Sequence, residues 1–341
     1  MLREVNKIAQ TYIGGGGSVC LYAFEDMDGW AAVAASHTKS DETYMPFGQG
    51  IEITTTRNNN AERVFGVGAR NATATVNKQY SGSFTVSGVL SNAYWLLGVL
   101  GANADAETTG AYTHTYTETD ILPSFTTTTS FELGTTDFAS DLIGCVVNQC
   151  TISAAVNEAL KFSLEGTYRY ENLGTTKLSN LADVEPVFTF AHGSVEMPDG
   201  TSIAAVQSFE LTIVNNAEAV FGIGSRFMTA VVAKNREYNF SMTAAFNDYT
   251  DLLTYFLNGT NTATAPDAGS GTEIATLELT FTNDDGDILD INLTGVHLNE
   301  ETLPQNSTEV VKEDVSGWAR ACTNIVYTND IEIAPAAADN I

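Results

Sequence analysis

One twelve-residue segment occurs twice in this chain, and this repeat limits the folds that the chain can adopt. Residues 59–70 read NNAERVFGVGAR and residues 215–226 read NNAEAVFGIGSR, with nine identical positions at a constant offset of 156 residues. The offset continues downstream, where Lys78 corresponds to Lys234. A period of about half the chain indicates the duplication of one domain and not a solenoid of short units.

The length of the chain supports the same division. A chain of 341 residues is too long for one ordinary core, and its 43% of hydrophobic residues can supply a core to each half. A polar stretch at 172–186 shows no strand alternation and indicates a boundary. We predict a first domain with an N-terminal arm over residues 1–172. A second domain, beginning with a linker and ending in a short tail, is predicted over 173–341.

Most segments alternate with a period of two residues and are rich in Thr, Val, Ile, Phe and Tyr, which is typical of β-strands. Matching strands are predicted at 81–90 and 238–246. Upstream of the repeated motif, IEIT at 51–54 matches FELT at 209–212 if the alignment slips by two residues.

Each copy also contains one short helical segment, at 91–100 and at 247–257, and we expect Ser91 to cap the first of them. Residues 277–282 alternate before an Asn-Asp-Asp-Gly turn at 283–286, which predicts a β-hairpin. The predicted fold is therefore mainly β. It consists of two tandem β-sandwich or barrel-like domains, each with one short α-helix.

The charge of the chain excludes one class of function. It has 42 acidic and 15 basic residues and a formal net charge of −27. Proteins that hold nucleic acid neutralise phosphates with clustered Lys and Arg, and this chain should repel DNA instead. A solubilising or salt-adapted surface explains the acidity equally well.

No pattern in the sequence predicts a catalytic residue, a cofactor or a metal ion. The histidines lie outside ligand spacing of one another and of any cysteine, and G-x-S-x-G is absent. The pairs Gly66/Gly68 and Gly222/Gly224 lack the third glycine and the following helix of a phosphate loop. They indicate a bulge or a close backbone approach within a strand. The acidic turn at 283–287 lacks the closing Glu of a calcium loop, and the hairpin explains it.

Cysteine usage and apolar runs suggest how the protein is made. Cys20, Cys145, Cys150 and Cys322 form no CxxC pair, and we expect them to be reduced core residues. No signal peptide is visible and no apolar run is long enough to span a bilayer, so we expect synthesis in a cytoplasm.

Two arginines recur at matched positions of the repeated motif. We expect Arg70 and Arg226 to form ion pairs within a domain or across an interface, with Glu62 and Glu218 as the natural partners. We predict that the motif is a repeated turn that serves assembly, and its candidate residues are Glu62, Phe65, Gly66, Gly68, Arg70, Glu218, Phe221, Gly222, Gly224 and Arg226.

The order of these segments resembles a known family. A loop with Pro198-Asp199-Gly200, the strand at 209–214, the repeated motif, further strands and a short helix look like the tail tube (major tail) proteins of long-tailed bacterial and archaeal viruses. Residues 140–171 are similar to the closing segment of that family, two strands ending in a glycine. The resemblance covers most of 28–172 and 187–330.

The resemblance implies a twisted β-sandwich with one helix, six-membered rings, and rings that stack into a hollow tube for the genome. Three chains with two domains each would complete such a ring, with a formal charge of three times −27, or −81. It also implies contacts with baseplate and terminator proteins in the virion tail, DNA as cargo that does not stick, and no enzymatic activity. Acids expected to face the bore are Glu210, Asp284, Asp285 and Asp287.

Two other functions remain open from the sequence. A carbohydrate- or cell-surface-binding β-sandwich would be a stable monomer with a concave aromatic patch, but Trp30, Trp95 and Trp318 are scattered. Another tail or baseplate adaptor of the same fold is the second alternative. Residues 1–26, with a Gly-rich joint at 14–17, suggest an arm that connects rings.

Overall fold

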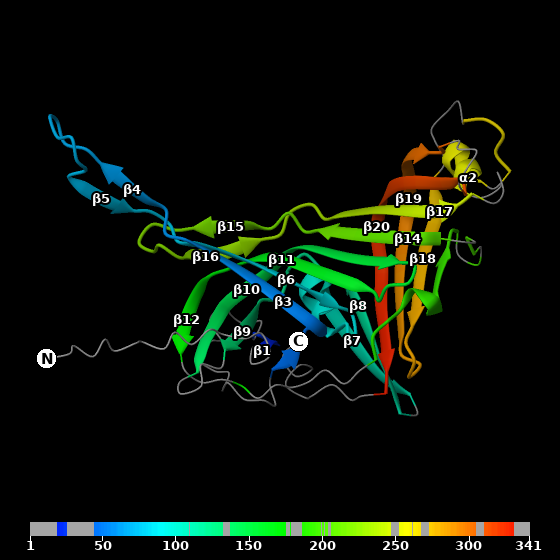
Figure 1. The fold of residues 1–341 in the computed structure, drawn as a ribbon, viewed down its shortest axis with the longest axis horizontal. Helices are drawn as coiled ribbons and strands as arrows, with labels where there is room; N and C mark the ends of the chain where they lie inside the picture. Colours follow the sequence, from blue (N-terminus) through cyan, green and yellow to red (C-terminus); the bar gives the residue numbers. More distant parts are fainter. Residues whose placement is uncertain are drawn as a thin grey trace, which may run out of the picture.

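The computed structural model describes residues 19–25, 44–108, 110–131, 137–174, 178, 186–198, 200, 202–203, 206–246, 252–260, 262–266, 273–304 and 310–330. The fold of this part is mainly β with short helices, as predicted (Figure 1). Most of the expected arm and most of the expected boundary lie outside the described residues. Residues 19–24 of the arm form a strand, so this part of it is not a free connector.

The described residues of the first half form twelve strands and a short helix. The strands are β1 (Val19–Phe24), β2 (Met45–Pro46), β3 (Gln49–Asn58), β4 (Ala61–Val64), β5 (Ala74–Asn77), β6 (Ser81–Val89), β7 (Gly101–Thr108), β8 (Ala111–Glu118), β9 (Phe125–Phe131), β10 (Phe138–Ala155), β11 (Lys161–Tyr168) and β12 (Tyr170–Gly174). A 3-10 turn, η3 (Tyr94–Leu96), leads into α1 (Leu97–Leu100).

The second half contains the remaining described elements. They are η4 (Phe190–His192), β13 (Gly193–Glu196), β14 (Val206–Val214), β15 (Glu218–Phe221), β16 (Met228–Val232), β17 (Glu237–Ala245), α2 (Leu252–Asn258), β18 (Ile274–Thr282), β19 (Ile288–Thr302) and β20 (Lys312–Asn329).

One antiparallel sheet runs through both halves. Its strand order is β13-β18-β19-β20-β17-β14-β10-β11-β6-β3, and it passes from one half to the other where β14 pairs with β10. We call this pairing, of Gln149–Ala155 with Ser208–Val214, the internal junction. Strand β8 also crosses to pair with β20, and one hydrophobic core extends beneath both halves. The division at residues 172 and 173 stays a prediction, because the halves share this sheet and core.

The strand registers of the two halves keep one offset. Asn58 of β3 lies opposite Ser81 of β6, and Val214 of β14 lies opposite Glu237 of β17. Both members of the second pair are 156 residues beyond those of the first. The two-residue slip assumed in the alignment is therefore wrong, and the offset of 156 continues upstream of the repeated motif.

Both predicted helices exist, although the first begins later than predicted. The capping position of η3 is Ala93, without a side-chain hydrogen bond, and Ser91 is buried, so Ser91 does not cap the helix as expected. Gly101 ends α1 with a left-handed φ of 109°, a conformation that favours glycine. Helix α2 stops before Gly259, and its expected start at 247–251 lies outside the described residues.

The predicted hairpin at 283–286 is confirmed as the connection between β18 and β19. Asn283 Oδ1 accepts the backbone N–H groups of Asp285 and Asp287 at 3.1 and 2.9 Å, and Gly286 has a left-handed φ of 93°. Asn283 therefore organises this turn with its own side chain.

The cysteines are free, and three of them are buried as expected: Cys145, Cys150 and Cys322. Burial raises the pKa of Cys322 to about 12, which keeps this thiol protonated at neutral pH. No helix in the described ranges combines the length and the apolar composition needed to cross a membrane.

Candidate assembly surfaces

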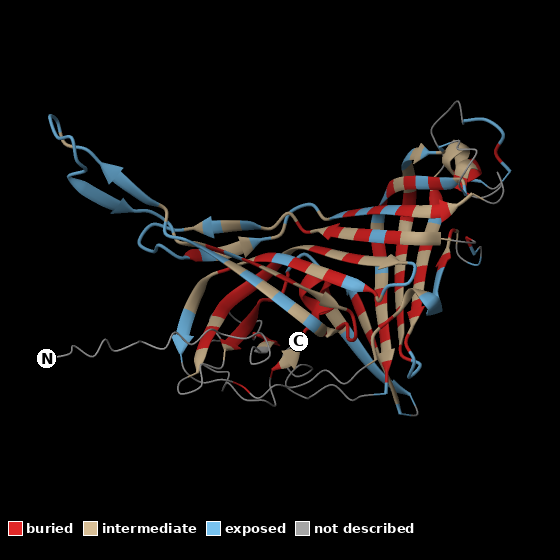
Figure 2. Cartoon of the chain, in the orientation of Figure 1, coloured by how far each residue is buried: buried red, intermediate tan, exposed pale blue. Residues whose placement is uncertain are grey.

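Eight neighbouring strands carry a polar surface on the side of the sheet away from the core. These strands are β19, β20, β17, β14, β10, β11, β6 and β3. Along β17 and β11, buried apolar residues alternate with more exposed polar ones, and Figure 2 shows the alternation of burial along the strands of the sheet. The strand registers place Ser153, Glu210, Ser241 and Ser316 side by side in one row across the sheet. We call this surface of hydroxyls, amides and carboxylates the polar face.

The polar face has more exposed acids than bases. Its exposed acids include Glu52, Glu165, Glu210, Glu237, Glu300 and Asp314. Among its bases, Lys161 is paired with Glu158 at the rim, and Arg320 is paired with Glu273. The described part of this face therefore has no cluster of Lys or Arg of the kind that binds phosphates.

The four acids expected to face a bore lie in different places. Glu210 is exposed on the polar face, and Asp284 and Asp285 are exposed at the β18–β19 turn. Asp287 is only 4% exposed, and its carboxylate accepts a hydrogen bond from Asn283 Nδ2 at 2.7 Å. The expectation for Asp287 is wrong, because its carboxylate stabilises the turn from within.

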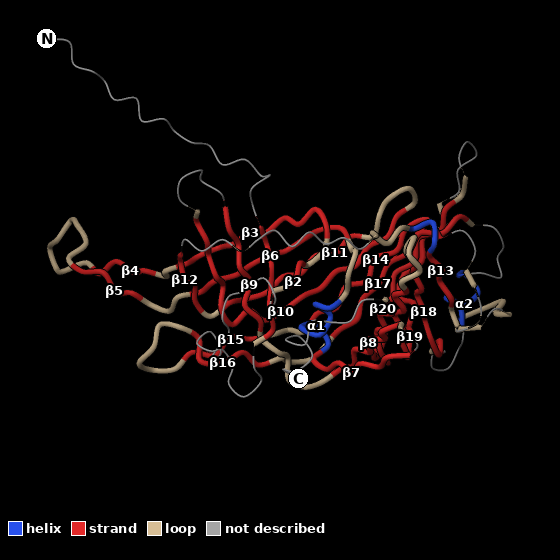
Figure 3. Tube along the Cα trace, turned by 90° about the horizontal axis from the view of Figure 1, so that it is seen from below, coloured by secondary structure: helices blue, strands red, loops and turns tan. Residues whose placement is uncertain are grey.

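The repeated motif folds as two β-hairpins. The first hairpin (β4–β5, residues 61–77) and the second hairpin (β15–β16, residues 218–232) project beyond the main sheet (Figures 1 and 3). Gly68 and Gly224 turn at the tips with φ of 80° and 100°. Gly68 and Gly224 thus serve turns and not strand bulges, whereas Gly66 and Gly222 show the other predicted role, a close approach of the backbone. At Gly66 the backbone approaches Thr73 so closely that an added Cβ would lie 3.1 Å from its methyl group.

The expected partners of the two arginines are wrong. Glu62 pairs with Lys78, and Glu218 pairs with Lys234. The hairpin register places each glutamate opposite the end of the second strand, and the lysine follows two residues later in the chain. The arginine lies in the loop that joins the two strands. Lys234 lowers the pKa of Glu218 below its ordinary value, as expected for an ion pair.

Arg226 instead joins the two hairpins. Its Nε donates to the carbonyl oxygen of Lys78 at 2.8 Å, and its Nη2 donates to that of Asn59 at 3.1 Å. The neighbouring Phe227 packs against Tyr80 with a ring separation of 5.7 Å. Arg70, its counterpart in the first hairpin, is exposed and bonds to none of the described residues.

Apolar side chains are exposed along both hairpins. Val67 and Ile223 are fully exposed at the two tips, and Phe65 is 58% exposed, whereas Phe221 is half-buried. Exposed apolar groups on a projecting element indicate a contact with another molecule or another copy.

The internal junction contains an asparagine clamp that the sequence did not reveal. Asn148 bulges out of β10; its carbonyl oxygen accepts the N–H of Asn215 at 2.8 Å, and its Oδ1 accepts the N–H of Ala217 at 2.7 Å. Asn215 Nδ2 donates to the Val147 carbonyl at 3.2 Å, and Arg236 Nε donates to Asn215 Oδ1 at 2.7 Å. The motif begins with Asn-Asn in both copies, which was the only sequence signal of this clamp.

Two of the unpaired strand edges among the described residues concern assembly, the edge at β3 and the edge along the end of β19. Within the described residues, β3 pairs only with β6. Strand β19 pairs with β18 only as far as Val296, so no described strand pairs with one side of residues 298–302, while the other side pairs with β20.

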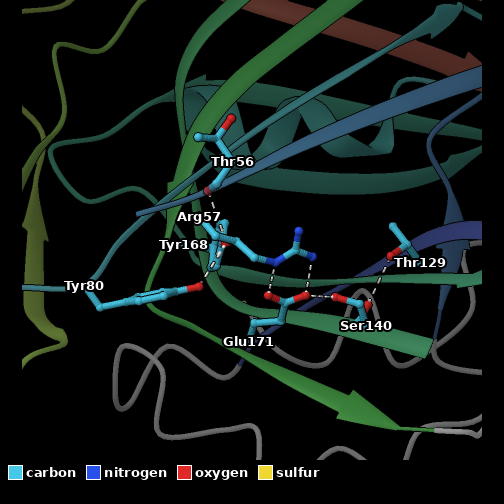
Figure 4. A network of polar contacts seen from close by, with 7 residues as sticks. All are labelled: Thr56, Arg57, Tyr80, Thr129, Ser140, Tyr168 and Glu171. Atoms are coloured by element: carbon cyan, nitrogen blue, oxygen red, sulfur yellow. Dashed lines mark hydrogen bonds and ion pairs between the residues drawn. The ribbon is translucent and has the colours of Figure 1, made fainter. Parts of the chain in front are cut away.

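A polar network anchors the β3 edge to β12 (Figure 4). Arg57 Nη2 donates to Glu171 Oε1 at 2.5 Å, and Ser140 donates to the same carboxylate. The bond from Arg57, followed by that from Ser140, lowers the pKa of Glu171. Tyr168 donates to the carbonyl oxygen of Thr56 at 3.3 Å and contacts the hydroxyl of Tyr80. The edge strand is thus held in place before any partner binds.

Other kinds of site find little support in the described part of the chain. There, no group of three or more His, Cys, Asp or Glu side chains is arranged to hold a metal ion. Trp95 is buried, and Trp318 stacks on His297 with a ring separation of 4.4 Å. Trp30 lies outside the described residues.

A continuous sheet with a polar face, unpaired strand edges and apolar projecting hairpins is typical of a structural protein that contacts other copies or other proteins. A family model described as phage tail tube protein matches residues 17–316, and the chain belongs to this family. The family is structural and not enzymatic, and membership makes the chain a component of the virion tail that assembles with copies of itself and with other tail proteins. No curated protein matches the chain significantly.

Proposed function

We propose that three copies of this chain close into a ring, and that the rings stack into the hollow tail tube through which the viral genome passes. The internal junction carries this proposal. Within one chain the sheet already continues from one half to the other, while no described strand pairs with the outer side of β3 or of residues 298–302 of β19. A head-to-tail contact between such edges repeats from copy to copy, and it gives a closed ring when the rotation between neighbouring copies closes. Six-membered rings, implied by the resemblance, then need three chains of two halves each.

The polar face is the proposed wall of the bore. Its hydroxyls, amides and carboxylates offer DNA phosphates few cations to bind, and carboxylates such as Glu210 repel them. At physiological ionic strength this repulsion extends over about 8–10 Å, so it acts close to the wall. The genome can then slide without being held.

The two hairpins are the proposed contacts between neighbouring copies. Burial of the exposed apolar tips, Val67 and Ile223, against another copy would stabilise the stack, since each buried aliphatic side chain contributes about 1.5–3 kcal/mol. The baseplate and terminator proteins are proposed to contact the first and last rings of the tube.

Electron microscopy tests the assembly directly. The purified chain of 36.4 kDa is concentrated at increasing ionic strength, which screens repulsion between acidic rings, and is examined by negative staining and native mass spectrometry. We expect rings with a three- or sixfold outline, a trimer mass and, at higher concentration, hollow tubes. A chain that stays monomeric in all conditions, with or without other tail proteins, would contradict the proposal.

Charge reversal tests the bore. We expect tubes of Glu165→Lys/Glu210→Lys to retain short duplex DNA in co-sedimentation, because both positions lie on the polar face. Tubes of the control Asp284→Lys/Asp285→Lys, changed at an exposed turn outside that face, should not retain it. Equal retention by both variants would refute the assignment of the bore.

A further inference from the structure

Strands β10 and β19 occupy matching positions, although their sequences differ. Val147 of β10 lies opposite Gly166, and Leu298 of β19 lies opposite Gly317. Both members of the second pair are 151 residues beyond those of the first. The two glycines lie beneath matched rings, since an added Cβ would be 2.6 Å from Phe84 Cζ at Gly166 and 2.7 Å from Phe240 Cζ at Gly317.

The next residue of each strand is an asparagine that the register leaves unpaired. In β10 the bulge between Val147 and Gln149 contains Asn148, and in β19 the bulge between Leu298 and Glu300 contains Asn299. Asn148 accepts two backbone N–H groups from the other half of the chain. Asn299 is exposed, and no described residue bonds to it. The open edge of β19 therefore presents the same acceptors that the internal junction uses.

The matching donors stand on the other open edge. Asn215 and Ala217, which donate to Asn148, correspond at the offset of 156 to Asn59 and Ala61. Asn59 directly follows β3 and Ala61 begins β4, and both residues are exposed. One chain thus carries hydrogen-bond acceptors at Asn299 on one edge and backbone donors at Asn59 and Ala61 on the other. The equivalent groups already bond to each other at the internal junction.

We propose that chains of the ring join in the register of the internal junction, with Asn299 of one chain accepting the N–H groups of Asn59 and Ala61 of the next chain. This inference rests on the proposed ring. It identifies the second copy as the occupant of both edges and fixes which residues meet. Glu300 then lies opposite Asn58, Glu301 opposite Arg57, and Thr302 opposite Thr56.

One pair in this register differs from the internal junction and makes the outer contact specific. Cys150 and Ile213 meet at the internal junction, and both are fully buried. Their counterparts, Glu301 and Arg57, carry opposite charges. One carboxylate oxygen of Glu301 is buried without a hydrogen-bond partner among the described residues. The guanidinium of Arg57 is 47% exposed beside Glu171, and it can bind both carboxylates. An edge with an apolar residue at this position, such as Ile213 of β14, would leave Glu301 unpaired, which favours β3.

Proline at position 304 does not interrupt this pairing. Val156 N–H donates to the Gln207 carbonyl at 2.9 Å, so alternate residues of β10 from Val156 backwards point their N–H groups at β14. Pro304 corresponds to Ser153. Ser153 lies at one of the intervening positions of β10, whose N–H groups point away from β14. The missing N–H of Pro304 therefore removes no hydrogen bond between chains.

The first hairpin adds a contact at the same interface. Arg226 donates to the carbonyl oxygens of Lys78 and Asn59 in the other half of the chain. Arg70 corresponds to Arg226 at the offset of 156 residues, as Lys234 and Asn215 correspond to Lys78 and Asn59. Arg70 would therefore donate to the carbonyl oxygens of Lys234 and Asn215 in the neighbouring chain. This role explains why Arg70 has no partner in the described part of a single chain, although both copies of the motif have an arginine at this position.

Disulfide cross-linking tests the register. Thr151 and Thr212 face each other at the internal junction with hydroxyl oxygens 3.4 Å apart, so Thr151→Cys/Thr212→Cys should form a disulfide within one chain. Thr56→Cys/Thr302→Cys is the matched pair between chains, and we expect it to yield disulfide-linked dimers and trimers on non-reducing gels. In Thr56→Cys/Glu300→Cys the second cysteine is displaced by two residues from the proposed register, and this pair should yield few disulfide-linked dimers or trimers.

The outcomes separate this inference from the proposed function. Rings in the microscope with cross-links only in the displaced pair, or in neither pair, would overturn the register and leave the ring standing. Failure of the unmodified chain to form any ring would remove the proposed function and the inference together. Cross-linked trimers from the in-register pair would support both.

Substitution of the two clamp asparagines gives a second test. We expect Asn148→Ala to lower the thermal midpoint of the single chain. Asn299→Ala should leave that midpoint unchanged and raise the concentration needed for assembly by roughly tenfold or more, because it removes a hydrogen-bond acceptor only between chains. Arg70→Ala should act like Asn299→Ala, and Arg226→Ala like Asn148→Ala. Assembly of Asn299→Ala at the wild-type concentration would overturn the clamp.

Discussion

The first asparagine of the repeated motif should matter very differently to folding in its two copies. Asn215 is 1% exposed, and its amide donates to the carbonyl oxygens of Val99 and Val147 at 3.1 and 3.2 Å. Its side-chain oxygen accepts a charge-assisted bond from Arg236 at 2.7 Å. Two neutral bonds of about 1 kcal/mol each and one charged bond of about 1.5–3 kcal/mol predict that Asn215→Ala lowers the free energy of unfolding by about 3–5 kcal/mol.

Asn59 provides the matched control. It is exposed, and its side chain accepts one long bond of 3.3 Å from Arg226. We therefore expect Asn59→Ala to lower the free energy of unfolding of the single chain by less than about 1 kcal/mol. Its effect should appear in assembly instead.

Urea denaturation of both variants, below the concentration at which rings form, measures the difference. The midpoints are compared at equal slope, so that a shift reports stability. Equal losses for the two variants, or a loss below about 1 kcal/mol for Asn215→Ala, would refute the assignment of Asn215 to a buried junction.

Three further outcomes are expected. Gly166→Ala and Gly317→Ala should each lower the free energy of unfolding by about 3 kcal/mol, because the added Cβ would lie 2.2 and 2.4 Å from a carbonyl oxygen of the neighbouring strand; unchanged denaturation midpoints would contradict this. The lowered pKa of Glu171 means that its bond to Arg57 stabilises the fold above the unfolded pKa of about 4.3 and is lost as pH falls through the folded value. Arg57→Met should therefore lose about 1 kcal/mol at pH 7, and the difference from wild type should shrink below pH 4 in acid titrations of stability; a constant difference would argue against it. Cys322, with a pKa raised to about 12, should resist iodoacetamide at pH 8 in the native chain and react after unfolding, as followed by mass spectrometry; rapid labelling of the native chain would contradict its burial.

Local sequence signals predicted much of the fold. Alternation of apolar and polar residues located the strands, the Asn-Asp-Asp-Gly turn located the β18–β19 hairpin, and Gly101 marked the end of α1. These patterns involve residues close together in the chain, and local conformational preferences are sufficient to determine the strands, the turn and the helix end. The repeat likewise indicated two equivalent hairpins before their position was known.

Side-chain partners across strands could not be predicted in the same way. Glu62 was assigned to Arg70 by proximity in sequence, but the hairpin register brings Lys78 to it. Asp287 was assigned to a bore by its charge, but the turn encloses its carboxylate. Both errors arise because contacts between side chains depend on register and burial, which sequence spacing does not contain.

The two copies of the motif show where local sequence stops being informative. NNAE begins each copy, and in each copy it begins a hairpin with the same register, turn glycine and ion pair. Only the tertiary structure places Asn215 in the internal junction and leaves Asn59 on an open edge. The physical reason is that hydrogen bonding within a hairpin is local, whereas the strand that a sheet edge meets depends on segments more than sixty residues away, such as Asn148 for Asn215, or on a second chain.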